Sequence, residues 1–302
     1  MNFDFGAVFT RAWQITWKNK VLWVLTVLPF LVSFLFLPLW LFAVYSQDLN
    51  PNRMLRFMEN QNLMILISIF YLVIFAASMF LQIISRASVT LGIYRVEMKE
   101  HPIGFLSLLE GGLAYFWRIL GAACLTAAGM MAFYVVFFAC AALASVATMG
   151  LGMICIQPLF LLMIPLMLLA MAFLEQAEAA IIVDGMSILD ASSRAIELIK
   201  NHVWKYVLIT FVVYFVMNIL ITVVMVPFIL PMFFFMTDNF ESGLDFGNVF
   251  KMQSLIIVIL LPIMTIIQGF SLTYIKAAMM VTYLRLTRST SESNIAMQPA
   301  TA

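Results

Sequence analysis

Long apolar stretches dominate the chain, and short polar segments separate them. A helix needs about 20 mostly apolar residues to cross the hydrocarbon core of a bilayer. Six stretches meet this requirement: Val21–Tyr45, Leu63–Ile84, Phe116–Val146, Leu151–Leu174, Tyr206–Phe235 and Leu255–Lys276. They lack the alternation of apolar and polar residues that marks the strands of a membrane barrel. The pattern therefore predicts an all-α, polytopic membrane protein with six transmembrane helices.

Amphipathic segments precede the first, third and fifth spans. Near the N-terminus, aromatic residues recur every four positions: Phe5, Phe9, Trp13 and Trp17. This spacing is typical of a helix that lies in the headgroup zone of a membrane. Before the fifth span, Ser187 and Asp190 form a capping-box pattern, and before the third span Ser107 with Glu110 is the expected cap. The sequence thus predicts three interfacial amphipathic helices.

Short motifs recur in the same order along the chain. Arg11-Ala12 with Lys18-Asn19 matches Arg194-Ala195 with Lys200-Asn201. Charges nine residues apart end the even-numbered spans, as the pairs Arg86 and Arg95, Glu175 and Asp184, Lys276 and Arg285. We therefore expect one membrane domain over 1–288, built from parallel repeats of about 1–98, 99–184 and 185–288. The polar tail 289–302 is predicted to be a disordered cytoplasmic segment.

The distribution of basic residues predicts the orientation. With six spans, one side carries Arg11, Lys18, Lys20, Arg86, Arg95, Lys99, Arg118, Arg194, Lys200, Lys205, Lys276, Arg285 and Arg288, and the other side carries Arg53, Arg56 and Lys251. Lysine and arginine are enriched on the cytoplasmic side of membrane proteins. Both termini are therefore predicted to be cytoplasmic.

Composition agrees with a membrane protein and excludes several other classes. The chain is 64% hydrophobic and 10% charged, whereas soluble domains carry about 25% charged residues. Membrane lipids are thus its expected surroundings. A net charge of +1 gives no reason to expect nucleic acid as a partner. The three cysteines and two histidines show no metal-ligand spacing, so we expect no metal and no cofactor.

The sequence offers no equipment for catalysis. It contains no nucleophile motif and no phosphate-binding motif, so the protein is not expected to be an enzyme. Within the spans, Asn218 and Gln268 could form hydrogen bonds between helices or line a polar path. The third span is rich in small residues, which let helix backbones approach closely. We therefore expect that span at the centre of the bundle.

Four charged residues lie near the predicted cytoplasmic ends of the spans, namely Arg86, Glu175, Glu178 and Lys276. Charge within a bilayer is unfavourable unless it is paired or functional. Two interpretations stay open: an ion-paired cluster that holds the repeats together, or the cytoplasmic mouth of a path or headgroup site. Glu175 is expected to pair with Arg86 or Lys276, because a carboxylate between two cations is favourable.

The segment Ala179–Leu208 combines an apolar run, an acidic residue, an amphipathic helix with Arg-Ala and a basic-aromatic entry into the next span. It resembles the glycerophosphodiester phosphodiesterase membrane-domain family and related uncharacterised bacterial six-helix families. The N-terminal FTRAWQITWKNKVLWVL and Tyr283–Leu286 fit the same pattern. The resemblance implies the topology and a bacterial inner membrane. It implies no phosphodiesterase activity, because the spans leave no room for the separate catalytic barrel.

Two functions follow as hypotheses. The first is a non-catalytic structural, assembly or anchoring role, with a membrane-protein partner or a homo-oligomer. The second is a transporter or permease subunit for a small or lipid-like molecule. A polar cavity that extends toward the middle of the bilayer would favour the second, whereas a solid core would favour the first.

Overall fold

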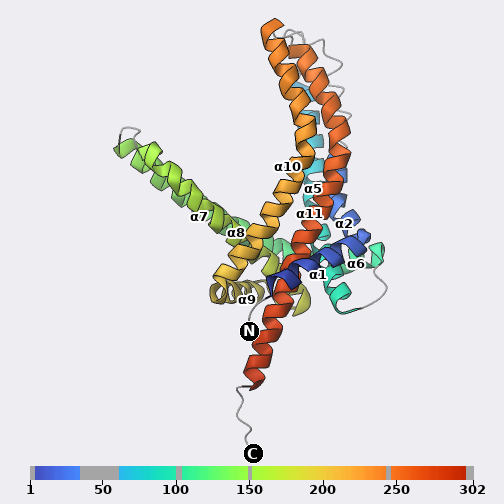
Figure 1. Ribbon diagram of the computed structural model, residues 1–302, viewed down its shortest axis with the longest axis vertical. Coiled ribbons are helices and arrows are strands. Elements are labelled where there is room, and N and C mark those ends of the chain that lie inside the picture. The colour runs from blue at the N-terminus through green and yellow to red at the C-terminus, as the bar shows by residue number, and fades with distance from the viewer. Residues whose placement is uncertain (1–3, 35–60, 100–103, 149–151, 243–245, 297–302) are drawn as a thin grey trace, which may run out of the picture.

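The computed structural model describes residues 4–34, 61–99, 104–148, 152–242 and 246–296. All regular elements in these ranges are α-helices (Figure 1). They are α1 (Phe5–Lys18), α2 (Lys20–Ser33), α5 (Gln61–Glu97), α6 (Phe105–Ala114), α7 (Phe116–Ala147), α8 (Gly152–Val183), α9 (Ile188–Asn201), α10 (Val203–Ser242) and α11 (Phe246–Ala296). The all-α prediction is confirmed for the described residues.

Five of these helices are long and apolar enough to cross a membrane. A sixth span is counted if α1 and α2, which meet at an angle of 78°, are taken together. The first predicted span runs on to Tyr45, and its residues 35–45 lie outside the described part of the chain. The chain is therefore a multi-pass integral membrane protein.

The long helices continue well past the predicted spans. The spans were expected to end near Ile84, Leu174 and Lys276, but α5, α8 and α11 run on to Glu97, Val183 and Ala296. Residues 289–296, predicted to be disordered, are helical. No proline or glycine occurs in residues 289–296, so α11 continues there although its residues are polar. The prediction placed each helix end where the apolar run ends. That point marks the boundary of the hydrocarbon core, and the helix itself can extend beyond it.

Burial divides the molecule into two regions. The buried residues gather at one end of the long helices, in 84–93 of α5, 172–182 of α8, 206–217 of α10 and 270–286 of α11. The short helices α1, α6 and α9 surround that end, which we call the packed layer (Figure 1). From it the long helices extend as diverging arms, and the hairpin of α7 and α8 leans away from the pair formed by α10 and α11.

The third predicted span, now α7, lies at the edge of the molecule and not at its centre. Only Ile119 and Ala122, both near its start, are buried. The position of Gly129 faces open space, since an added Cβ there would meet no atom within 4 Å. Small residues permit close helix approach but do not supply a partner. In lipid an exposed apolar helix carries little free-energy penalty, so the abundance of small residues alone did not indicate where α7 lies.

The short helices begin as the local sequence dictates, with one exception. Ser187 caps α9, as predicted: its hydroxyl accepts the Asp190 N–H at 3.4 Å and donates to Asp190 Oδ2 at 2.6 Å. The cap predicted for α6 is wrong, because that helix begins at Phe105 with Gly104 as its N-cap. Ser107 lies in the first turn and accepts a hydrogen bond from Arg95 Nη1 at 3.1 Å. Ser107 thus bonds to α5 and does not cap its own helix.

The first amphipathic helix packs its aromatic residues against the last long helix. The ring centroids of Trp13 and Trp17 are 5.8 Å apart, and Phe270 of α11 lies 5.3 Å from Trp13 and 5.2 Å from Trp23 of α2. Trp13 and Trp17 are also 44% and 57% exposed. Such half-exposed indoles are typical of the membrane–water interface.

Candidate functional site

The four charged residues singled out in the sequence meet in one cluster, which we call the ion-pair box. Arg86 extends from α5, Glu175 and Glu178 from α8, and Lys276 from α11. Arg86 contacts Glu178 through Nε at 2.6 Å and Glu175 through Nη2 at 3.0 Å. Lys276 Nζ lies 2.9 Å from Glu175 and 2.6 Å from Glu178. Each carboxylate thus bridges both cations, and the box ties three helices together.

Small residues next to the charged ones explain why the box can form. Ala87 and Ser88 follow Arg86, while Ala177 and Ala179 flank Glu178, and all of them are buried. Short side chains let the backbones approach closely, so that charged groups from different helices come within contact distance. Thr90 of α5 completes the arrangement, since its hydroxyl is 3.5 Å from Lys276 Nζ and donates to the Arg86 carbonyl at 2.9 Å.

Burial is unequal across the ion-pair box. The Glu178 side chain is 0% exposed and those of Lys276 and Glu175 are 8% and 9% exposed, whereas that of Arg86 is 25% exposed. The formal charges cancel, which is the condition under which buried ions are tolerated. Arg86 uses Nε and Nη2 in the box. Its Nη1 has no hydrogen-bond partner among the residues described, so one cationic edge stays available.

A cavity of about 220 Å³ lies directly against the ion-pair box. Arg86, Glu175 and Lys276 form its charged floor. The remaining lining residues come from α2, α5, α10 and α11 and are Thr26, Pro29, Phe30, Ser78, Gln82, Ser85, Val89, Tyr214, Leu272 and Ile275. Ser78 and Gln82 precede Arg86 by eight and four residues, or about 12 and 6 Å along the helix axis. The cavity therefore extends from the box toward the arms.

The cavity walls alternate between polar and apolar groups. Ser85 donates to the Leu25 carbonyl at 2.6 Å, and Thr26 shares a 2.9 Å hydrogen bond with Thr273. Gln82 is exposed and has no hydrogen-bond partner within the described ranges. Pro29, Phe30 and Leu272 supply apolar surface. A polar floor with mixed walls suits a molecule that has a polar head and an apolar body.

The other two polar candidates lie elsewhere. Asn218 is exposed, and its amide donates to the Tyr214 carbonyl of its own helix at 2.8 Å. Among the described residues this bond stays within α10, so a hydrogen bond from Asn218 to another helix remains a prediction. Gln268 is half-buried. The cavity lining contains neither residue.

Gln176 fills the role expected of Asn218, and the sequence reasoning missed it. It is fully buried, accepts a hydrogen bond from the Tyr206 hydroxyl at 3.1 Å and donates to the Met279 carbonyl at 3.3 Å. It therefore links α8 to α10 and α11. Its place between Glu175 and Glu178 was the available signal, since three polar residues within four positions of an apolar run indicate a protein-facing stripe.

Metal chemistry receives no support from the described residues, which contain no group of three or more His, Cys, Asp or Glu side chains able to hold an ion. Cys124 and Cys140 are free and exposed.

Comparisons with protein-family models, with curated proteins and with solved structures gave no match. The resemblance to the glycerophosphodiester phosphodiesterase membrane-domain family therefore stays a prediction. The functional argument rests on the site itself.

Proposed function

We propose that this protein is a non-catalytic inner-membrane protein that binds a lipid-like molecule in the cavity above the ion-pair box and transports it. The observation that supports it is the cavity between the apolar helices, which has a charged floor and walls of mixed polarity. A purely structural bundle has no need of such a space. Of the two functions considered from the sequence, the transporter or permease subunit is thus the one that the geometry favours.

The polar groups of the cavity support a ligand more than a structural role. The ion-pair box satisfies its own charges, and Thr26 and Ser85 tie helices together. Gln82 and the free edge of Arg86 hold nothing together in the described residues. Polar groups inside a membrane are unfavourable unless they have partners or a function. We assign them to the polar head of the ligand.

The diverging arms support a lipid-like ligand over a water-soluble one. Side chains at the arm end of α5 are apolar and exposed, including Ile65, Leu66 and Leu72. Acyl chains of a bound amphiphile could lie along this surface while the head occupies the cavity. A hydrophilic solute would need a polar route through the same region.

We infer in addition that the chain is a threefold repeat with both termini in the cytoplasm. The short helices α6 and α9 each precede two long helices, and α1 precedes α2 and the long helix α5. The predicted equivalent residues Arg86, Glu175 and Lys276 all belong to one cluster. The ion-pair box would then be a pseudosymmetric closure at the cytoplasmic end of the cavity. Reporter fusions at His101 and after Arg288 should report inside; an external signal at His101 would overturn the orientation.

The transport proposal is tested with the purified protein in liposomes that contain fluorescent short-chain phosphatidylethanolamine, phosphatidylglycerol or phosphatidylcholine. A membrane-impermeant reductant then measures the movement of each lipid between leaflets. We expect movement of at least one lipid, and a Ser78→Phe variant should slow it tenfold or more by filling the cavity. Ser145→Phe on α7 is the matched control and should leave the rate unchanged. Equal rates for the parent and Ser78→Phe, or a parent that moves none of the lipids, would refute the proposal.

A further inference from the structure

A second cavity, of about 210 Å³, lies apart from the ion-pair box in the packed layer. Arg11 of α1, Glu97 of α5 and Arg285 of α11 line it, together with Val281 and Leu284. We propose that this arginine cavity binds a phosphate group, carried either by a phospholipid head or by a soluble anion. The inference does not depend on the proposed transport function, so each can fail alone.

The charges of the arginine cavity do not cancel. Two guanidinium groups face one carboxylate, which leaves a net charge of +1 on the lining. This contrasts with the neutral ion-pair box. The Val281 and Leu284 side chains are buried, and such apolar walls strengthen electrostatic attraction within the cavity. An anion is therefore the ligand that the cavity favours.

Most of the hydrogen-bond donors in the arginine cavity have no acceptor among the described residues. Arg11 donates through Nε to Glu97 Oε1 at 2.7 Å, and Arg285 donates through Nη2 to the Ala7 carbonyl at 3.4 Å. A guanidinium carries five N–H donors. The bond of Arg285 is long compared with charge-assisted bonds of about 2.7–2.9 Å. Arg285 is thus only weakly held and has donors to offer.

The geometry of two arginines selects phosphate among anions. A guanidinium fork matches the oxygen pairs of phosphate and carboxylate. A phosphate has at least three acceptor oxygens with which to reach both guanidinium groups, whereas a carboxylate has two. A phosphate bridging Arg11 and Arg285 would fasten α1 to α11, replacing the weak Arg285–Ala7 contact.

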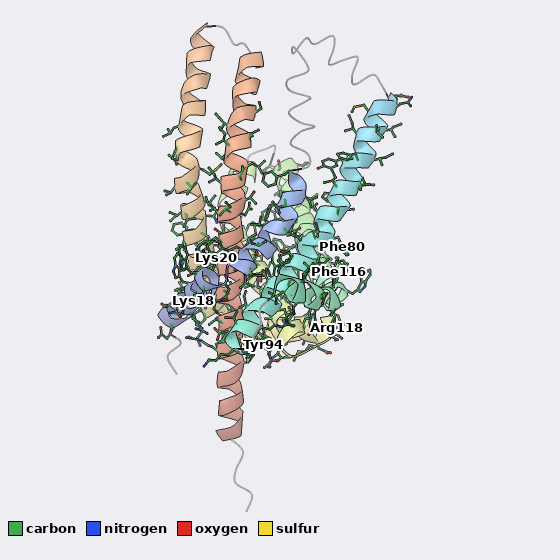
Figure 2. The ribbon with its side chains drawn as sticks, turned by 90° about the vertical axis from the view of Figure 1, so that its right-hand side faces the viewer. Lys18, Lys20, Phe80, Tyr94, Phe116 and Arg118 are labelled. Atoms are coloured by element: carbon green, nitrogen blue, oxygen red, sulfur yellow. The ribbon has the colours of Figure 1, made fainter. Side chains whose placement is uncertain are left out.

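The surroundings provide a reason for a lipid source. Lys18 and Lys20 lie at the corner between α1 and α2, in the same middle section of the molecule as Tyr94 and Arg118 (Figure 2). The interfacial indoles Trp13 and Trp17 belong to the same helix as Arg11. Basic residues next to half-exposed indoles are typical of headgroup level. A soluble phosphate would have the same chemistry, and the experiment separates the two.

The test measures thermal unfolding of the full chain, delipidated in an uncharged detergent. Inorganic phosphate, phosphatidylglycerol and phosphatidylcholine are added separately, with chloride at matched ionic strength as the reference. We expect inorganic phosphate or phosphatidylglycerol to raise the unfolding temperature by several degrees, and phosphatidylcholine to raise it less than phosphatidylglycerol. A shift with phosphatidylglycerol alone identifies a lipid head, and a shift with inorganic phosphate alone identifies a soluble anion.

Three variants decide whether the arginine cavity is responsible. Arg285→Gln should abolish the shift, and Arg285→Lys should retain only part of it, since a lysine keeps the charge without the fork. Glu97→Gln should act in the opposite direction and tighten binding threefold or more, because it removes the competing carboxylate. Arg118→Gln, outside the cavity, is the control. The proposal fails if the parent shows no shift, if Arg285→Gln shifts like the parent, or if Glu97→Gln weakens the shift.

Discussion

The packed layer and the arms are built from the same helices, yet different forces hold them. In α5, residues 84–93 are almost all buried by other helices, whereas Ile65 and Leu72 are 57% and 66% exposed. Lipid solvates apolar side chains as well as protein does, so burial gives little drive for association in the arms. Polar pairs and close backbone contacts can fix the relative positions of helices where the hydrophobic effect cannot. The packed layer has both.

Breaking the ion-pair box should have the largest effect on stability. Glu178 is fully buried and contacts both cations. Glu178→Gln removes one carboxylate charge and leaves the cations undercompensated, which should lower the free energy of unfolding by about 3–5 kcal/mol. Thermal unfolding in detergent measures the loss.

The matched control for Glu178 is Glu197→Gln on α9. Its partner Arg194 lies at 3.4 Å, and the Glu197 side chain is 62% exposed. An exposed pair of this kind contributes at most about 1 kcal/mol. If the two variants lose equal stability, the ion-pair box is not what distinguishes the packed layer.

Two amides on apolar helices should show the next largest difference. Gln176→Leu would leave the Tyr206 hydroxyl and the Met279 carbonyl without their partner, which should cost about 1–3 kcal/mol. Asn218→Leu on the exposed face of α10 removes only a bond within its own helix and should cost less than about 0.5 kcal/mol. Chemical unfolding of both variants in the same detergent measures the difference. A greater loss in Asn218→Leu would show that the arms carry polar contacts after all.

Two glycines give the most local comparison. A Cβ on Gly112 of α6 would lie 2.2 Å from Ser88 Oγ and 2.9 Å from the Ser88 backbone nitrogen, whereas one on Gly129 of α7 would meet nothing within 4 Å. Gly112→Ala should push α6 from α5 and cost about 1–3 kcal/mol. Gly129→Ala should gain up to about 1 kcal/mol through helix propensity. Thermal unfolding of the pair checks the signs, and a gain at Gly112 would contradict this contact.

The sequence predicted what depends on single residues and failed where several elements combine. The span beginning at Phe116 is placed correctly, since an apolar run has a clear edge. The members of the ion-pair box were identifiable, because a charged residue within an apolar run is unfavourable unless it is paired or functional. The cavity was not predicted, since Thr26, Ser78 and Gln82 are individually unremarkable and come from two helices. The position of α7 depends on which helices pack against it, and the composition of a single span does not identify those helices.

The first helices pack against the last one, so during synthesis they must wait for their partner to be made. Thr26 and Thr273, whose hydroxyls share a hydrogen bond, are 247 residues apart in the chain. At roughly 5–20 residues per second, the ribosome needs about 12–50 s to make the second after the first. For that time the N-terminal helices are in the membrane without the neighbour that covers their aromatic face. A nascent chain that stalls before α11 would expose this face, and quality-control proteases could use it to recognise incomplete molecules.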